Sequence, residues 1–256
     1  MPTVPHQARD LAESFGADAQ RYDRARPGYP AELVRSVVAA APGRDFLDVG
    51  IGTGIAARQF EDAGCTVLGV EVDARMAELA RRRGFAVEVA RFEQWDPAGR
   101  AFDAVVSGQT WHWIDPVAGA AKAAQALRPG GRLAVFWNVM QPPPELARAF
   151  AAIYRELVPD LPFDPWGKPV LDLYEPILAK AVEGLRGPFG EPEQGRFDWV
   201  RHYTRAEWLD QIPTFGGFSR FPPDTQSALL TAVAAAVGDG FTMAYATVAL
   251  TAARAE

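Results

Sequence analysis

Residues Phe46 to Gly54 read FLDVGIGTG, a short apolar stretch with one acidic residue that ends in three glycines at alternate positions. The apolar stretch is typical of a buried strand, and the amphipathic segment that follows at 54–63 is typical of a helix. Glycines at such a turn let the backbone approach a ligand closely, and the start of the helix directs free N–H groups at it. The stretch therefore predicts a ligand-binding loop.

Two classes of cofactor fit a loop of this kind. Gly52, Gly54 and Ala57 match the G-x-G-x-x-G/A pattern of dinucleotide-binding folds, and Glu71 lies where their ribose-binding acid is expected. Asp48, just before the glycines, favours the other class, because its charge repels a pyrophosphate and attracts the α-amino group of an amino acid. The loop thus favours a zwitterionic cofactor, and a nicotinamide cofactor stays open as the alternative.

The composition limits the class of protein. The 256-residue chain has a net charge of -6 and lacks a basic stripe, so we do not expect nucleic acid as a partner. Cys65 is the only cysteine, and no Cys/His cluster has metal-ligand spacing, so we expect no disulfide and no metal site. The N-terminus lacks the apolar core of a signal peptide, and no apolar run approaches the roughly 18 residues of a membrane span. We therefore expect a cytoplasmic protein that does not bind membranes.

Apolar runs alternate with helical stretches in the first half of the chain. The runs lie at 45–49, 66–70, 86–90, 102–106 and 132–137, and the helical stretches at 54–63, 74–83 and 116–127. A further helix is expected to begin at Pro30, because proline is favoured in a first turn. Alternating strands and helices form a parallel sheet with right-handed crossovers that is covered on both faces. The sequence therefore predicts a doubly wound α/β fold.

The alternation ends where prolines become frequent, between Pro142 and Pro169. Proline cannot occupy a central strand, so we expect no long regular elements among these prolines. Amphipathic helices are expected near 144–157 and 173–184, the second with Pro176 in its first turn. We interpret 139–190 as a helical cap insertion over the carboxyl edge of the sheet; a surface excursion without ligand contact is the alternative. The rest of the chain predicts strands at 196–203 and 241–251 and helices at 204–212 and 223–237.

Four motifs, in this order and spacing, resemble the class I S-adenosylmethionine-dependent methyltransferases. They are FLDVGIGTG at 46–54, VLGVEVDARM at 67–76, FDAVVSGQTWHWID at 102–115 and LRPGGRLAVFWN at 127–138. RYDRARPGYP at 21–30 is also similar to the opening of a bacterial small-molecule branch, the methyltransferase type 11 group. The resemblance implies a mostly parallel Rossmann-like sheet with an antiparallel C-terminal hairpin at its edge.

The resemblance also implies one methyltransferase domain over 1–256 that binds S-adenosylmethionine. We expect an N-terminal flap at 1–29, a cofactor-binding core at 30–138, the cap at 139–190, and the C-terminal hairpin and helices at 191–256.

Most of the implied cofactor ligands lie at the carboxyl ends of the strands. Glu71 would accept hydrogen bonds from both ribose hydroxyls. Glu93 would hold the adenine amino group and Phe92 would offer its backbone N–H, although many family members have an acid where this chain has Arg91. The set includes Asp48, Gly50, Gly52, Gly54, Val72 and Met76, and also Ser107 and Gln109, whose backbone carbonyls would face the sulfonium.

The resemblance places Tyr22 and Arg26 on a flap over the site. A guanidinium and a phenol are suitable partners for the carboxylate of the cofactor. The rival interpretation is that Tyr22 packs in the core and Arg26 pairs with a surface acid.

The acceptor side is indicated by Trp111, His112 and Trp113, which follow the fourth strand. Their rings offer a stacking surface and one group that titrates near neutrality. His112 would serve as general base toward a hydroxyl or amine; alternatively it is a neutral, hydrogen-bonded core residue. Trp137 and Asn138, at the end of the fifth strand, would complete the wall of the acceptor site.

The sequence predicts an S-adenosylmethionine-dependent methyltransferase with a small-molecule acceptor. Methyl transfer from a sulfonium is an in-line displacement, so holding the nucleophile roughly 3 to 3.5 Å from the methyl carbon supplies much of the acceleration, and a base is optional. A non-catalytic S-adenosylmethionine-binding module and an NAD-dependent oxidoreductase remain alternatives. The oxidoreductase would need a proton-donating Tyr/Lys pair or a similar catalytic set in the second half of the chain, and we find none with recognisable spacing. A nucleic-acid acceptor is not expected, because no Asn/Asp-Pro-Pro-aromatic element follows the fourth strand.

Overall fold

The computed structural model describes residues 13–161, 166, 167 and 169–255. The first twelve residues of the expected flap, and residues 162–165 and 168 of the expected cap, lie outside this range. The chain forms two compact units. The Rossmann unit comprises Pro27–Asn138, Pro176–Phe197 and Thr247–Glu256, and the aromatic unit comprises Met1–Arg26, Val139–Glu175 and Asp198–Ala246.

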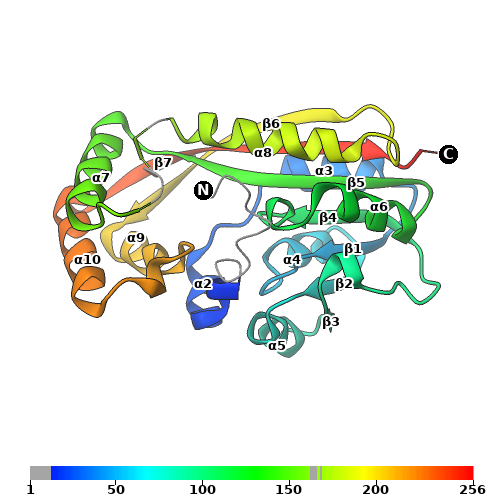
Figure 1. Ribbon diagram of the computed structural model, residues 1–256, viewed down its shortest axis with the longest axis horizontal. Coiled ribbons are helices and arrows are strands. Elements are labelled where there is room, and N and C mark those ends of the chain that lie inside the picture. Colours follow the sequence, from blue (N-terminus) through cyan, green and yellow to red (C-terminus); the bar gives the residue numbers. More distant parts are fainter. Residues whose placement is uncertain (1–12, 162–165, 168, 256) are drawn as a thin grey trace. The chain divides into compact units, whose positions relative to one another are not determined.

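The strands form a seven-stranded sheet in the order β3-β2-β1-β4-β5-β7-β6 (Figure 1). They are β1 (Asp45–Val49), β2 (Thr66–Glu71), β3 (Ala86–Val89), β4 (Phe102–Gly108), β5 (Leu127–Gln141), β6 (Glu193–Thr204) and β7 (Gly240–Ala253). Strands β1 to β5 pair in parallel, and the C-terminal strands are antiparallel. The predicted Rossmann-like, mostly parallel fold is therefore confirmed. The order changes direction between β1 and β4, where ligands of such sheets bind.

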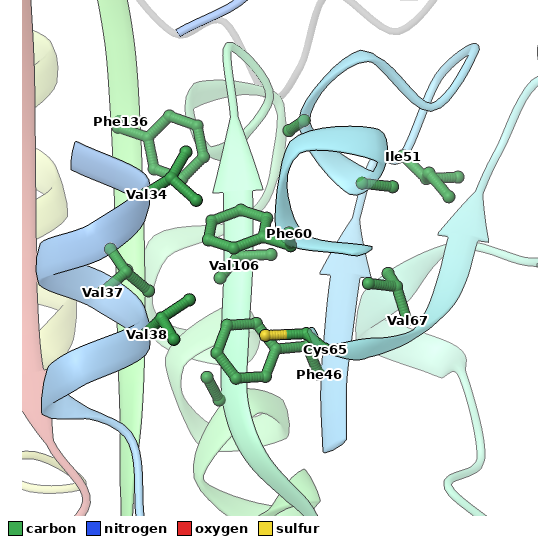
Figure 2. Packing of buried hydrophobic residues seen from close by; sticks show 14 of the residues in the cluster. Val34, Val37, Val38, Phe46, Ile51, Phe60, Cys65, Val67, Val106 and Phe136 are labelled. Carbon is green, nitrogen blue, oxygen red and sulfur yellow. The ribbon is translucent and has the colours of Figure 1, made fainter. Parts of the chain in front are cut away.

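The helices of the Rossmann unit follow the predicted pattern. They are α3 (Ala31–Ala40), α4 (Ile55–Asp62), α5 (Ala74–Arg82) and α6 (Pro116–Ala126), with short 3-10 turns η3 (Phe92–Gln94) and η4 (Trp111–Trp113). The α5 and α6 helices begin at aspartates whose side chains accept backbone N–H groups of the first turn. Figure 2 shows Val34, Val37 and Val38 of α3 pointing into the core that also contains Phe136 and Cys65.

The aromatic unit contains helices around a core of stacked rings. Its elements are η2 (Glu13–Asp18), α2 (Ala19–Ala25), α7 (Pro144–Leu157), α9 (Arg205–Gln211), η5 (Ile212–Thr214), η6 (Phe218–Arg220) and α10 (Pro223–Val237). The Trp208 ring lies 5.9 Å from the Phe150 ring in a stacked arrangement and 5.2 Å from the Phe241 ring in a T-shaped one. Such pairs add to the free energy gained from burying the rings. None of the helices in the described ranges is long and apolar enough to cross a membrane.

The structure differs from the sequence expectations at one helix of the region after the core. Helix α8 (Val170–Leu185) begins three residues before the expected 173, so Pro176 lies inside the helix instead of in its first turn. The proline removes one backbone hydrogen bond of the helix, a local cost that tertiary packing overrides. The expected cap 139–190 stays a prediction; its described residues are divided between the two compact units at Pro176.

Candidate functional site

The glycine loop, Gly50–Gly54, leaves β1 and is held against the end of β2. The backbone N–H groups of Gly50 and Ile51 both donate to the carbonyl of Val70, at N···O distances of 2.8 and 3.3 Å. Gly69 on β2 has no side chain, and a Cβ there would lie 2.6 Å from Ile51 Cδ1. Ile51 therefore packs directly onto the β2 backbone and fixes the position of the loop.

The structure explains the three glycines of the loop in different ways. The φ angles of Gly50, Gly52 and Gly54 are 71°, 58° and 89°, in the left-handed region that glycine adopts most readily. A Cβ on Gly50 would lie 2.2 Å from Thr110 Cγ2, and one on Gly54 would lie 2.7 Å from Phe85 Cε2. At Gly52 the closest such contacts would be at 3.9 Å, an ordinary van der Waals distance, so packing does not require glycine at this position and only its φ angle favours it.

Asp48 of β1 carries a buried carboxyl group directly before this loop. Its side chain is 1% exposed, and within the described ranges Oδ2 has no hydrogen-bond partner. Burial, and to a lesser degree the Glu71 carboxyl, raises the pKa of Asp48 to about 8. The charge that the sequence suggested is therefore absent from most molecules at neutral pH until a cation stabilises it. The unpartnered oxygen fits a ligand that brings a positively charged donor.

Glu71, at the end of β2, ties three backbone segments together. The N–H of Gly52 donates to Oε2, and the N–H groups of Val72 and Asp73 donate to Oε1, each at an N···O distance of 2.9 Å. Burial raises the pKa of Glu71, and these three bonds oppose that rise. A carboxylate offers about four acceptor positions, so binding both ribose hydroxyls requires one backbone donor to give way. Of its two expected companions, Met76 is buried and Val72 is exposed.

The end of β4 is fixed to β1 and β5 by polar side chains. The Ser107 hydroxyl donates to the Val49 carbonyl at 2.9 Å, so its side chain serves the sheet and only its backbone is left for a ligand. Gln109 has a left-handed φ of 56°, which is rare outside glycine, and its Nε2 donates to the Asn138 carbonyl at 3.0 Å. The Thr110 hydroxyl donates to the Gly108 carbonyl at 3.1 Å. The turn after β4 is therefore rigid.

The residues expected at the adenine ring support the start of α6. Phe92 is buried, and its ring lies 6.2 Å from both the Trp95 and the Trp111 rings. The backbone N–H of Asp115 donates to Glu93 Oε1 at 3.1 Å. One oxygen of Glu93 therefore already has a partner, and adenine recognition by this residue stays a prediction.

The three consecutive aromatic residues after β4 differ in burial. Trp111 is almost fully buried beside Phe92, and its indole Nε1 has no partner among the residues that the structure describes. His112 and Trp113 are partly exposed, with ring centroids 4.7 Å apart. The area available for stacking an acceptor therefore belongs to His112 and Trp113 more than to Trp111.

A hydrogen bond from Trp137 fixes the tautomer of His112. The indole Nε1 of Trp137 donates to His112 Nδ1 at 3.0 Å, and since an indole N–H can only donate, Nδ1 must be unprotonated. Although part of the residue is exposed, desolvation by the surrounding residues lowers the pKa of His112 to about 3, so the neutral ring carries its proton on Nε2. The only basic lone pair is then occupied by Trp137. The geometry favours the neutral, hydrogen-bonded interpretation, and the general-base role stays a prediction.

Asn138 has its polar groups satisfied within the Rossmann unit. Its Nδ2 donates to the Gly28 carbonyl at 3.0 Å, and its Oδ1 accepts the Thr247 hydroxyl at 2.6 Å. Asn138 therefore positions the chain around Gly28, beside Tyr29, whose ring packs edge-on against Phe136 at 4.7 Å. Its expected part in the acceptor wall is untested.

Tyr22 and Arg26 belong to the aromatic unit. The Arg26 guanidinium lies 5.0 Å from the centroids of both the Tyr22 and the Phe215 rings, and its Nη2 donates to the Thr214 carbonyl at 2.6 Å. No carboxylate of the described residues pairs with it, so the surface ion pair of the rival interpretation is not found in that part of the chain. The cofactor-binding role of both residues remains a prediction.

Sequence reasoning missed three residues that position the site. Thr110 occupies the space beside Gly50, Gly69 makes room for Ile51, and Gln59 exchanges two hydrogen bonds with the Tyr29 backbone at 2.8 and 2.7 Å. A glycine inside a strand often marks a close approach, so Gly69 carried a signal. Thr110 and Gln59 carried none, because their partners are distant in sequence.

Comparison with known proteins identifies the class to which this fold and site belong. The family model described as "Methyltransferase domain" matches residues 47–135. A malonyl-[acyl-carrier protein] O-methyltransferase of Enterobacter lignolyticus is 33% identical over 74% of this chain and 72% of the relative. The chain belongs to the class I S-adenosylmethionine-dependent methyltransferases.

Other curated relatives are aligned with this chain over a smaller share of their own length. An uncharacterized methyltransferase of Mycobacterium tuberculosis is 35% identical over 51% of this chain and 54% of that protein, so this chain spans about half the length of such relatives. A solved structure described as a type II methyltransferase of Anaeromyxobacter dehalogenans covers 88% of this chain and 97% of its own at 23% identity, with a TM-score of 0.65. This likeness concerns the fold alone.

Alanine at Gly50 and at Gly52 separates packing from ligand access. Each alanine would sit at a positive φ, which costs roughly 1–2 kcal/mol. Only Gly50→Ala also drives a Cβ into Thr110, which adds about 1–3 kcal/mol. We expect urea unfolding to show a larger loss of stability for Gly50→Ala than for Gly52→Ala. Equal losses would mean that Thr110 does not require glycine there.

The ring nitrogens of His112 provide a direct test of its protonation form. We expect ¹⁵N chemical shifts of the Nε2–H form, unchanged between about pH 5 and 8, because burial lowers the pKa to about 3. The His112→Gln variant assigns the signals, and Trp137→Phe should free Nδ1 and change the pattern. A ring that titrates near pH 6.5 would restore the general-base role.

Proposed function

We propose that this chain transfers the methyl group of S-adenosylmethionine to a small-molecule acceptor. The observation that carries the proposal is the buried Asp48 oxygen without a partner in the described residues, next to a glycine loop in which a Cβ at Gly52 would meet no atom closer than 3.9 Å. A dinucleotide would bring phosphates to this place, whereas an adenosyl amino acid brings an ammonium group. The site is therefore matched to the second cofactor class.

The residues of the Rossmann unit fit this cofactor in their chemistry. Asp48 would receive the ammonium group, and Glu71 would exchange a backbone donor for ribose hydroxyls. Gly52 would let the backbone approach the cofactor, and Met76 Cε lies 3.9 Å from the position that a Cβ on Gly52 would take. When bound, S-adenosylmethionine supplies a methyl carbon that its sulfonium already activates.

The protein contributes mainly position. The turn after β4 is held by hydrogen bonds from Ser107, Gln109 and Thr110 and presents backbone carbonyls in a fixed arrangement. His112, with its proton on Nε2, would donate a hydrogen bond to an acceptor oxygen. Holding the nucleophile in line with the methyl carbon lowers the barrier without a base.

The alternatives differ in what they require. Membership of the methyltransferase family argues against an NAD-dependent oxidoreductase. A binding module that catalyses no reaction would keep the same cofactor-binding residues. The name of the Enterobacter relative gives a malonyl group on acyl-carrier protein as its acceptor. We therefore include a malonyl thioester among the candidate acceptors.

Ligand-dependent stability tests the cofactor. We expect S-adenosylhomocysteine, but not NAD, to stabilise the protein, by about 2.7 kcal/mol at a hundred times its dissociation constant. Thermal unfolding with each ligand gives the answer, and stabilisation by NAD alone would refute the proposal. Methyl transfer from labelled S-adenosylmethionine to an acceptor panel then separates an enzyme from a binding module.

Binding of S-adenosylhomocysteine should release protons from Asp48. The free carboxyl has a pKa of about 8, and a bound ammonium would lower it, so up to one proton leaves near neutral pH. We expect affinity to rise with pH by up to about tenfold per unit between about pH 6 and 8. Calorimetry in two buffers of different ionisation enthalpy measures the release.

The Asp48→Asn variant is the matched control. It keeps the shape of the side chain without a titrating group, so the proton release should disappear. In the free protein, the pKa of Asp48 lies above its ordinary value of 3.8, so the free energy of unfolding falls as pH rises from about 4 to 8. The variant should lose this slope. Equal proton release by both proteins would remove Asp48 from the site.

A further inference from the structure

Tyr29 is a partly exposed aromatic residue in a rigid part of the Rossmann unit. Its backbone is fixed to α4, because its N–H donates to Gln59 Oε1 at 2.8 Å and its carbonyl accepts Gln59 Nε2 at 2.7 Å. Its ring packs edge-on against Phe136 of β5, with ring centroids 4.7 Å apart. Backbone and ring are both held, so the fold sets the position of the hydroxyl group.

The Tyr29 hydroxyl lies at the carboxyl end of β4. A Cβ on Gly108, the last residue of that strand, would lie 2.5 Å from the hydroxyl oxygen and 2.7 Å from Phe136 Cε2. The φ angle of Gly108 is not positive, so the close approach of these two rings is the reason for glycine here. The phenol therefore reaches the edge of the sheet at which ligands of such folds bind.

Hydrogen-bond donors of the turn after β4 are directed at protein carbonyls. The backbone N–H of Gln109 donates to the Phe136 carbonyl at 2.8 Å, and its Nε2 donates to the Asn138 carbonyl at 3.0 Å. The Thr110 hydroxyl donates to the Gly108 carbonyl at 3.1 Å. The polar groups that this turn offers a ligand are therefore mainly oxygen acceptors, and the Tyr29 oxygen lies beside them.

Oxygen acceptors of this kind suit a cation that carries C–H groups. The positive charge of a sulfonium polarises the C–H groups on its carbon atoms, and polarised C–H groups form weak hydrogen bonds to oxygen. A phenol oxygen keeps lone pairs for such contacts even while its proton is donated elsewhere. A neutral thioether lacks the charge that makes these contacts favourable.

We propose that the Tyr29 hydroxyl oxygen contacts the sulfonium of S-adenosylmethionine and positions its methyl group. This inference rests on the proposed function. The contact favours the charged methyl donor over its neutral product, S-adenosylhomocysteine. The carboxylate of the cofactor is the other group that a phenol could bind. Both ligands carry that carboxylate and only one carries the sulfonium, so a comparison of their affinities separates the two contacts.

The Tyr29→Phe variant removes the oxygen and keeps the ring that packs on Phe136. Calorimetric titration of the full chain should show about two- to fivefold weaker binding of S-adenosylmethionine and an unchanged affinity for S-adenosylhomocysteine. Neither titration needs a methyl acceptor. Circular dichroism verifies that the variant is folded.

The Gly108→Ala variant disturbs the same contact from the other side. Its Cβ would displace the Tyr29 hydroxyl, so the ratio of the two affinities should change as it does in Tyr29→Phe. The double variant should show no further change in this ratio, because both substitutions remove one contact.

Ser36 of α3, the helix that follows Tyr29, gives the matched control. Its hydroxyl donates to the Leu33 carbonyl of the same helix at 2.8 Å. Ser36→Ala also removes one hydroxyl from this region, and it should leave the affinities for both ligands unchanged.

Two results would overturn the proposal. An unchanged affinity of Tyr29→Phe for S-adenosylmethionine would show that the oxygen does not contact the sulfonium. Equal losses for both ligands would instead assign the hydroxyl to the carboxylate of the cofactor. Failure of the unmodified protein to bind S-adenosylhomocysteine at all would refute the proposed function itself, so the two failures are distinct.

Discussion

The hydrogen bonds of Glu71 are the interaction on which the candidate site depends. One carboxylate at the end of β2 accepts backbone N–H groups from the glycine loop and from the two residues that follow the strand. Without Glu71, three backbone N–H groups, one in the loop and two after β2, would lose their acceptor next to a buried strand end, which is costly. By accepting the Gly52 N–H, Glu71 fixes the middle of the loop, while the Val70 carbonyl holds its start. The same oxygens are the ones that a ribose would use, so cofactor binding must compete with this internal arrangement.

Asp48 and His112 illustrate how burial changes the chemistry of a residue type. Both titrate far from their ordinary values, and in each case loss of water favours the neutral form. For Asp48 the result is an acid that becomes charged when a cation arrives. For His112 the result is a hydrogen-bond donor in place of a base. Because both side chains are neutral in the free protein, the free-energy cost of burying an unpaired charge at the site is avoided.

The sequence predicted the fold well because the fold depends on local patterns. Apolar runs and amphipathic stretches repeat with the periods of strands and helices, and each of the first five strands overlaps its predicted run. Strand β5 is longer than predicted, because it begins at Leu127 instead of 132 and ends at Gln141. Pro176 shows the limit of such rules, since helix α8 continues through it. Local preference disfavours this position by a few kcal/mol, an amount that packing of a long helix can exceed.

By itself, the sequence determined the doubly wound sheet, the glycine loop and the acids at the ends of β1 and β2, because these are encoded by residues close together in the chain. Only the tertiary structure decided which hydrogen bonds and contacts these residues form. Trp137 fixes the tautomer of His112 across 25 positions, and Thr110 fills the space beside Gly50 from 60 positions away. Hydrogen bonds and burial depend on neighbours in space, which a linear pattern does not specify.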